Sequence, residues 1–309
     1  MVPLPSPQQL RYLIALAETR HFGRAALACA VTQSTLSAGL LTLERQLDAS
    51  ILDRSAGKHV VFTPLGQELV EHARTALTAL AAVTEAADAA RAPMSGPLRI
   101  GVIPTIGPFL VPRLMPALRE AFPRLKPWLR EDTTANLVTR LEAARLDVAV
   151  LALPCDCGTA DQVTLARDEF LVALPPNHPL AGIDAVPTAA LASERLLLLE
   201  EGHCLREQAL AVCGLMAGER GEAVDGFAAT SLHTLVQMVA SGLGVTLLPR
   251  LAVCTGVLTG TEVVLRPLAG AGAWRTLGLA WRRNAPRAPE YRTLGSKLGQ
   301  VCAGLLGEA

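Results

Sequence analysis

From residue 98 onward, short apolar runs alternate with helical stretches, and this alternation limits the possible folds more than any other feature of the sequence. The strand-like runs cover residues 98–103, 146–153, 170–174, 195–199, 244–248 and 276–281. Strands separated by helices predict an α/β fold with parallel strands, because a parallel pair needs a long crossover. Residues 104–107 and 229–231 each open a helix after a strand or loop, so we expect a small-ligand cleft at the carboxyl ends of the strands.

The composition is that of a folded protein of roughly two domains: 309 residues, 50% of them apolar and 18% charged. The net charge is zero, so no general basic excess indicates nucleic acid, although a small DNA-binding domain can be part of a neutral chain. No apolar run approaches the ~20 residues of a membrane helix, and no signal peptide is recognisable. We therefore expect a cytoplasmic protein with no membrane partner.

Motifs for bound cofactors are absent from the sequence, which contains no GxGxxG, Walker, HExxH or paired CxxC pattern. Nucleotide-binding and zinc-enzyme functions consequently have no motif support. We expect neither a cofactor nor a metal ion.

The N-terminal segment is helical. Ser6-Pro7 predicts the start of a helix that runs to about Thr19, and residues 23–30 predict a short second helix. Thr32 caps a third, whose apolar face consists of Leu36, Leu40, Leu43 and Leu47. Its opposite surface begins with short polar side chains. This order is typical of a helix-turn-helix, and an ordinary helical subdomain is the alternative.

Two short stretches after the third helix, residues 51–54 and 59–62, flank Ser55-Ala56-Gly57-Lys58 and predict a hairpin. Such a hairpin after a helix-turn-helix would be a wing. The side chains expected to contact DNA are Thr32, Gln33, Ser34, Thr35, Ser37, Arg54 and Lys58.

Thr63-Pro64 predicts the start of a long helix that continues to about Ala90. Its apolar positions form a heptad seam: Leu69, Ala73, Ala76, Leu80, Val83 and Ala87. A long helix with one apolar stripe needs a partner, and a second copy of the chain is the simplest; the alternative is packing on its own domain. Residues 92–97 are expected to be a linker.

Residues 200–214, EEGHCLREQALAVCG, predict a reactive cysteine. Cys204 should lie at or near the first turn of a helix, beside His203 and Arg206, and a helix N-terminus and positive charge both favour the thiolate. An inert buried cysteine is the alternative. Cys213 is nine residues on, about 13.5 Å along an unbroken helix and on its opposite face, so a disulfide between the two would require the segment to unwind.

The other five cysteines indicate no site. Cys155 and Cys157 flank Asp156 after a strand, and we interpret them as loop thiols rather than metal ligands, because Cys-x-Cys without a nearby histidine is a weak signal. Cys29, Cys254 and Cys302 are interpreted as core or incidental residues.

Four segments together resemble the LysR-type transcriptional regulators, over about residues 8–300. They are LRYLIALAETRHFGRAALACAVTQSTLSAGLLTLERQL, GPLRIGVIPTIGP, EEGHCLREQALAVCG and ATSLHTLVQMVASGLGVTLLP. The first is similar to the family's DNA-binding domain, and the third is similar to the hydrogen-peroxide sensors within the family. The resemblance implies an α/β protein with an all-α N-terminal winged helix-turn-helix, a long linker helix and a two-subdomain, periplasmic-binding-protein-like regulatory domain.

The resemblance also implies a domain division and residue roles. The DNA-binding domain would be 1–63, the linker and dimerisation helix 64–91, and the redox-sensing domain 92–309, with subdomains 97–168 plus 269–303 and 169–268. Cys204 would be the peroxidatic cysteine and Cys213 the resolving one. Thr105 and Thr134 would contact peroxide, His203 and Arg206 would tune the thiolate, and Thr230 and Ser231 would line the cleft.

The partners implied are promoter DNA, hydrogen peroxide as the signal, further copies of the chain in a dimer or tetramer, RNA polymerase, and a thioredoxin- or glutaredoxin-type reductant. The chain departs from the family at Ser34 and at Leu41-Thr42, where a Pro and a basic residue are usual. Residues 1–70 hold six basic and five acidic side chains, which predicts weak or less salt-sensitive DNA binding. A LysR-type regulator of a small anionic metabolite and a thiol peroxidase are the alternatives to a peroxide-sensing regulator that is not an enzyme.

Overall fold

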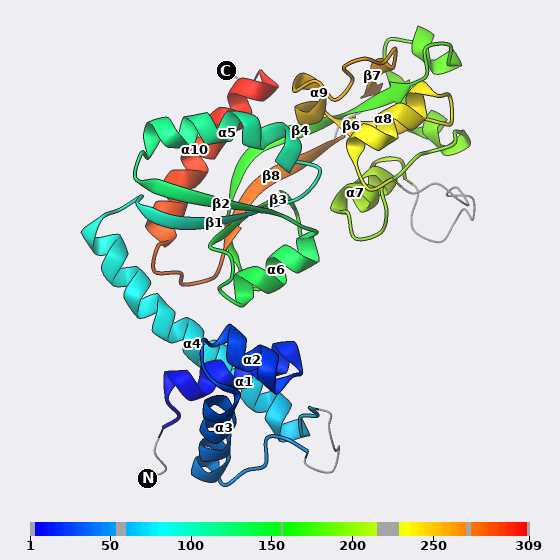
Figure 1. The fold of residues 1–309 in the computed structure, drawn as a ribbon. Helices are drawn as coiled ribbons and strands as arrows, with labels where there is room; N and C mark the ends of the chain where they lie inside the picture. Colours follow the sequence, from blue (N-terminus) through cyan, green and yellow to red (C-terminus); the bar gives the residue numbers. More distant parts are fainter. Residues whose placement is uncertain (1–3, 54–59, 156, 215–228, 270–272, 308–309) are drawn as a thin grey trace. The chain divides into compact units, whose positions relative to one another are not determined.

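The computed structural model describes residues 4–53, 60–155, 157–214, 229–269 and 273–307. Contacts within it divide the chain into two units, Met1–Asp88 and Ala89–Ala309 (Figure 1). The first unit is helical and the second is built on a sheet. The expected fold class is confirmed.

Three short helices form the first unit's core: α1 (Pro7–Thr19), α2 (Phe22–Ala28) and α3 (Gln33–Leu47). Ser6 begins α1 with a capping box, in which its hydroxyl and the Gln9 side chain each accept from the other residue's backbone N–H. The axes of α2 and α3 meet at 98°, as in a helix-turn-helix. The leucine face is buried at Leu36, Leu40 and Leu43, which pack against α1 residues.

The helix α4 (Pro64–Arg91) follows an antiparallel bridge between Leu52 and Phe62, which joins the two arms of the expected hairpin. Arg54 and Lys58 lie outside the described residues.

The apolar seam of α4 has two parts. Ala73 is buried in the first unit's core, whereas Leu80 and Val83 have exposed fractions of 49% and 69%. The first part packs on its own domain, as the alternative interpretation expected, and the second is uncovered.

One mixed sheet runs through the second unit in the order β2-β1-β3-β8-β4-β7-β5, with β6 paired to β4. Its strands are β1 (Gly96–Val102), β2 (Leu125–Glu131), β3 (Val148–Leu153), β4 (Asp161–Leu174), β5 (Val186–Pro187), β6 (Thr246–Pro249), β7 (Val264–Ala269) and β8 (Trp274–Trp281). The expected linker therefore ends earlier than predicted, since Gly96 already belongs to β1.

The expectation of parallel sheets was wrong for half of the unit. Strand β1 is parallel to β2 and β3, and β5 to β7, but β8 is antiparallel to both β3 and β4. The long strand β4 pairs with β8 over Asp161–Glu169 and then, over Phe170–Leu174, with β6 and β7, again antiparallel. Strands β4 and β8 join the two halves of the unit. Because this pair is antiparallel, it needs no helical crossover.

Two further expectations about strands failed. Residues 195–199 form isolated parallel bridges, Leu196 to Val245 and Leu199 to Ala229, rather than a strand. Strands β2, β5 and β7 were not predicted. Most of β2 is exposed at the edge of the sheet, and its Lys126, Pro127 and Arg130 hide the strand pattern.

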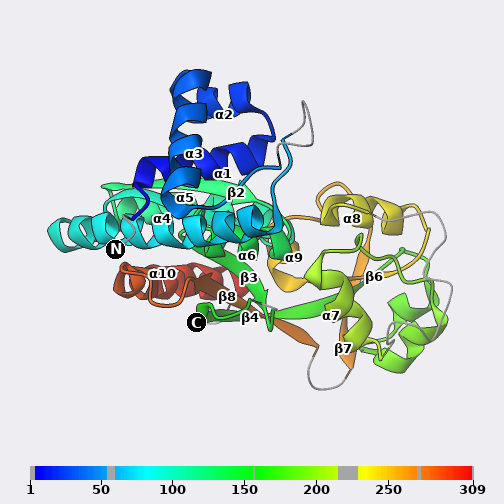
Figure 2. The same ribbon diagram turned by 90° about the horizontal axis from the view of Figure 1, so that it is seen from below.

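Helices cover both halves of the second unit: α5 (Gly107–Ala121), α6 (Thr134–Glu142), α7 (Cys204–Val212), α8 (Leu232–Ala240), α9 (Arg250–Cys254), α10 (Ala288–Leu306) and the 3₁₀ turns Pro179–Gly182 and Thr188–Ser193. Helix α10 packs on β4 and α5, and α6 packs on β3. Helix α8 packs on β4 and β6 in the other half, as the second view also shows (Figure 2). Within the described part of the chain, no single helix is long and apolar enough to span a membrane.

Candidate functional site

Cys204 is the first residue of α7, and His203 is its N-cap residue. The turn before the helix depends on Gly202, whose φ of +90° lies in the left-handed region that favours glycine. The cysteine is half-buried and is not part of a disulfide. Cys204 therefore lies at the positive dipole end of α7, where a helix leaves its first N–H groups without a partner in the helix itself.

Thr134 meets Cys204 from the other half of the unit. It is the first residue of α6, is 9% exposed, and has its hydroxyl oxygen 2.9 Å from the Cys204 sulfur. Either group can donate in this hydrogen bond, but a thiolate would accept from the hydroxyl. The N-terminal ends of α6 and α7 therefore come together at the sulfur.

Asp132 holds the start of α6 in place. Its carboxylate accepts from the Asn136 side chain at 2.7 Å and from the Thr133 backbone N–H at 3.1 Å. The Asn136 hydrogen bond, helped by Arg130 and the Thr133 N–H, keeps the pKa of Asp132 below its usual range. Asp132 is thus ionised at neutral pH and supports the helix end that carries Thr134.

Thr105 belongs to a buried network that sequence reasoning missed. The Arg275 guanidinium donates to the Thr105 hydroxyl at 2.8 Å and to its carbonyl at 3.1 Å, and also to the Asp168 carboxylate at 2.9 Å. Asp168 accepts in addition from the Leu251 N–H. Both charged side chains are buried, at 2% and 0% exposed. With its oxygen accepting from Arg275, the Thr105 O–H remains available to donate.

The sequence contains only part of the signal for this network: Arg275 is the one charge in the apolar run 274–281, whereas Asp168 lies between Arg167 and Glu169 and does not stand out. A buried charge needs a partner of opposite sign. The two lie 107 positions apart, and the pairing of β4 with β8 brings them together.

His203 and Arg206 lie close to Cys204 in the chain, but neither side chain is hydrogen-bonded to its sulfur in the part of the chain that the structure describes. The Arg206 guanidinium donates to the Leu199 carbonyl at 3.1 Å. The structure therefore brings Thr134, and not these two residues, into contact with the thiol.

Cys213 is the C-cap residue of α7 and is 6% exposed. Burial raises the pKa of its thiol to about 11. The whole of α7 separates it from Cys204, a rise of about 13.5 Å at 1.5 Å per residue. In this conformation the two sulfurs cannot bond.

Thr230 and Ser231 lie beside the segment that leads to α7. Ala229 bridges Leu199 and its carbonyl accepts from the Glu200 N–H at 3.0 Å. Ser231 is the N-cap residue of α8, and its hydroxyl accepts from the Thr234 N–H at 3.2 Å. Ser231 thus has a structural task at the helix end, and neither residue contacts Cys204 through a hydrogen bond within the described part of the chain.

The interpretation of Cys155 and Cys157 as loop thiols was wrong, because the structure joins them in a disulfide. Cys302 is buried and Cys29 half-buried, whereas Cys254 is exposed. In the described residues, no group of three His, Cys, Asp or Glu side chains is placed to hold a metal ion.

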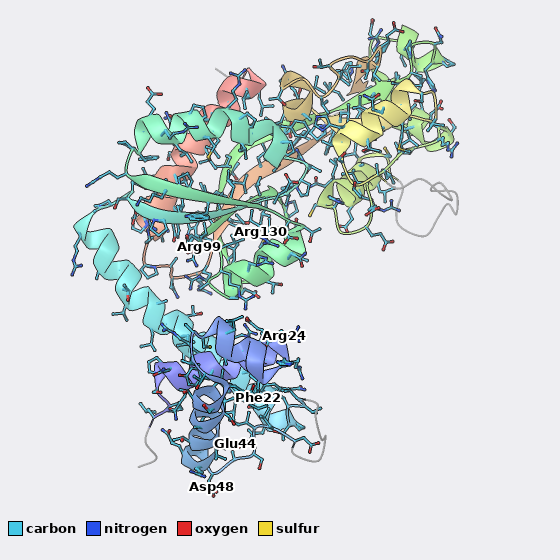
Figure 3. All side chains as sticks on the ribbon, viewed as in Figure 1. Phe22, Arg24, Glu44, Asp48, Arg99 and Arg130 are labelled. Carbon is cyan, nitrogen blue, oxygen red and sulfur yellow. A yellow bond between two sulfur atoms is a disulfide. The ribbon has the colours of Figure 1, made fainter. Side chains whose placement is uncertain are left out.

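The candidate DNA-contacting surface lies at the start of α3. Thr32 caps the helix, and its hydroxyl accepts from the Thr35 N–H at 3.2 Å and bonds Ser34 at 2.9 Å. The exposed side chains there are Thr32, Gln33, Ser34, Thr35 and Ser37. Glu44 lies toward the other end of α3 (Figure 3). Its carboxylate accepts hydrogen bonds from the backbone N–H groups of Ile51 and Leu52 in the following loop.

Comparison with known proteins identifies both units. Residues 7–67 match the bacterial regulatory helix-turn-helix proteins of the lysR family, and residues 91–303 match the LysR substrate binding domain. The chain is 42% identical to the DNA-binding transcriptional dual regulator OxyR of Escherichia coli K12 over 94% of both chains. It is 39% identical to a probable hydrogen peroxide-inducible genes activator of Streptomyces viridosporus, over 96% of this chain and 94% of that one.

Solved structures agree with these matches. A full-length OxyR variant of Pseudomonas aeruginosa superimposes with a TM-score of 0.75 at 33% identity, over 96% of this chain and 95% of that one. A hydrogen-peroxide-bound OxyR mutant of Corynebacterium glutamicum gives a TM-score of 0.68 at 30% identity, over 99% and 95%. The chain therefore belongs to the LysR family of bacterial helix-turn-helix regulators and closely resembles OxyR within it.

Proposed function

We propose that the chain is a hydrogen-peroxide-sensing, DNA-binding transcriptional regulator. The observation that carries the proposal is the contact between the Thr134 hydroxyl and the Cys204 sulfur at the meeting of two helix N-termini. Peroxide is small and uncharged, so its site must supply a thiolate and hydrogen-bond donors. Relatives named as hydrogen peroxide-inducible genes activators support the same reading.

In the first step, the Cys204 thiolate attacks one peroxide oxygen. The O–O bond breaks, the second oxygen leaves as hydroxide and takes up a proton to become water, and Cys204 becomes a sulfenic acid. The hydroxyls of Thr134 and Thr105 are the proposed donors to the peroxide oxygens, and His203 and Arg206 are proposed to help polarise the O–O bond. Arg275 and Asp168 position Thr105.

In the second step, the Cys213 sulfur attacks the Cys204 sulfur, the S–O bond breaks, and the hydroxyl leaves as water. This step requires α7 to unwind, because the helix holds the two sulfurs apart. The raised pKa of Cys213 supports its role as the second cysteine to react, because on the order of one Cys213 in 10⁴ is ionised at pH 7 and few are ready to attack peroxide. The disulfide then traps a rearranged segment.

The proposal extends to partners and domains. Promoter DNA would be read by the start of α3, with Arg54 and Lys58 on the wing, in a DNA-binding domain of residues 1–63. The uncovered part of the α4 seam would pair with a second copy of the chain. The two further partners in this proposal are RNA polymerase, at the promoter, and a thioredoxin- or glutaredoxin-type reductant, which would return the disulfide to two thiols.

A metabolite-sensing role fits the site less well. The buried Arg275 is not available to pair with an anionic ligand, because Asp168 already neutralises it. A thiol peroxidase would have no use for a helix-turn-helix, and its test is turnover: many peroxide molecules reduced per chain with thioredoxin present.

The test is alkylation mapping of the purified chain before and after one equivalent of peroxide. Trypsin places Cys204 in the peptide 196–206 and Cys213 in the peptide 207–220. We expect these two peptides to become linked, and promoter footprints to differ between the two forms. The Cys204→Ser variant should show neither change, and a Cys254→Ser variant should behave like the parent chain. A free Cys204 after peroxide treatment would refute the proposal.

A further inference from the structure

A second pair of sulfurs lies outside the Cys204 site. Cys155 and Cys157 form a disulfide just after β3 ends at Leu153, with their Cα atoms 5.3 Å apart. Cys157 is buried and Cys155 half-buried. The Ala160 N–H donates to the Cys157 carbonyl at 3.1 Å, so the loop has a defined backbone after the bond.

This disulfide contributes little to the stability of the fold. It closes a loop of three residues, and the entropy that a crosslink removes from the unfolded chain grows with loop length, so it is small for so short a loop. The strands on both sides are already anchored, since β3 and β4 each pair with β8. The strand pairing, and not this bond, therefore holds the two ends of the loop in place.

Oxidation and reduction of this pair need no rearrangement of the helices. A single residue separates the cysteines, so both sulfurs stay within reach after the bond opens, in contrast to Cys204 and Cys213 at the two ends of α7. A pair of this kind exchanges readily with other thiols, because attack on a disulfide requires only access to one sulfur.

The pair lies near the edge of the sheet that carries the Cys204 site. Strands β1 and β3 are parallel, so the residues after them, Thr105 and Cys155, follow strand ends at the same edge. Leu153, two residues before Cys155, pairs with Thr276, and the neighbouring Arg275 binds the Thr105 hydroxyl. Opening or closing the disulfide therefore changes the chain two residues from the end of β3, which pairs with the strand that holds Arg275.

We propose that Cys155 and Cys157 form a second redox couple, which a dithiol reduces and hydrogen peroxide re-forms. In reduction, a thiolate of the dithiol attacks one sulfur, the Cys155–Cys157 bond breaks, and the released thiolate takes up a proton. The second thiol of the reductant then displaces the remaining cysteine and leaves as a disulfide. In oxidation, one thiolate attacks peroxide to give a sulfenic acid and water, and the other sulfur displaces a second water.

The experiment uses the full chain with Cys204→Ser and Cys213→Ser, so that the proposed peroxide switch cannot contribute. Trypsin places both loop cysteines, and no other, in the peptide 146–167. The exposed Cys254 lies in the peptide 251–275, since trypsin does not cleave before Pro267, and it serves as the internal control. The folded protein is treated with excess dithiothreitol, desalted, and reoxidised with peroxide, and each stage is alkylated and weighed.

We expect peptide 146–167 to take up two alkyl groups after dithiothreitol and none after peroxide, when it should be two hydrogen masses lighter than the dithiol. Cys155→Ser in the same background should abolish the bridged form. A pair that opens only in denaturant would be a structural disulfide and would overturn the proposal. So would a pair that never closes, or a reduced pair that added Zn²⁺ protects from alkylation, which would indicate a metal site.

Discussion

The Thr134 hydroxyl lies 2.9 Å from the Cys204 sulfur, although the two residues are 70 positions apart in the chain. Thr134 begins α6, on the half of the regulatory unit that contains β1 to β3, and Cys204 begins α7, in the half that contains β6. A hydrogen bond to a charged acceptor contributes more than one between neutral groups. The contact therefore depends on the packing of the two halves against each other.

Replacing Thr134 tests that contact. We expect Thr134→Val, which keeps the shape and removes the hydroxyl, to slow the oxidation of Cys204 by peroxide about 10-fold to 100-fold, since hydrogen bonds to charged groups contribute roughly 1.5–3 kcal/mol. Thr134→Ser should restore most of the rate. The measurement is the second-order rate constant from quenched alkylation. Equal rates for the Val and Ser variants would show that the hydroxyl has no part in the reaction.

The neighbouring acids Asp168 and Glu169 offer a matched comparison of a buried and an exposed ion pair. Asp168 binds the buried Arg275, whereas Glu169 binds Arg250 at the surface, where the two side chains are 59% and 45% exposed. Arg275→Met should lower the free energy of unfolding by about 3–5 kcal/mol, because it leaves Asp168 buried without its partner.

The control, Arg250→Met, should cost less than about 1 kcal/mol. Urea unfolding measures both, and Asp168→Leu combined with Arg275→Met should recover much of the loss. Comparable destabilisation by the two Arg variants would contradict the assignment of Asp168 and Arg275 as a critical buried pair.

Stability should fall at alkaline pH through Cys213. Its thiol pKa rises from 9.0 to about 11 on folding, so the native state holds the proton more tightly than the unfolded state. The contribution is complete below pH 9 and is lost as the pH rises from 9 to 11, by up to about 3 kcal/mol.

Urea unfolding under reducing conditions at pH 8 and pH 11 measures this loss. The difference in unfolding free energy between the parent chain and Cys213→Ala should shrink over that range, whereas the difference between the parent and Cys254→Ser should stay constant. A constant difference for Cys213→Ala would mean that the thiol titrates normally in the folded protein.

The exposed part of the α4 seam predicts self-association. Val83 is 69% exposed on an apolar stripe, and a carboxylate there would be buried without a partner in any helix pair. Val83→Asp should therefore reduce the molar mass measured by light scattering from that of the oligomer toward that of a single chain. Thr84→Asp, one residue along and off the stripe, is the control. An unchanged mass for Val83→Asp would place the interface elsewhere.

Local patterns in the amino-acid order were enough for the helix-turn-helix and for the reactive end of α7. The leucine spacing of α3 reports which side is buried, because helical periodicity is a property of neighbouring residues. The cap before α3 at Thr32 and the start of α7 at Cys204 likewise depend on a few adjacent side chains.

Contacts between distant segments could not be read in the same way. The antiparallel course of β8, the pairing of Arg275 with Asp168 and the approach of Thr134 to Cys204 all depend on which strands lie side by side. The periodicity of a short segment does not specify which strands pair. Strand pairing depends on how the apolar surfaces of all the segments are buried together in the folded domain. The sequence therefore predicted Cys204 and Cys213 as the reactive pair, whereas the packing of the two halves decided that Thr134 contacts Cys204.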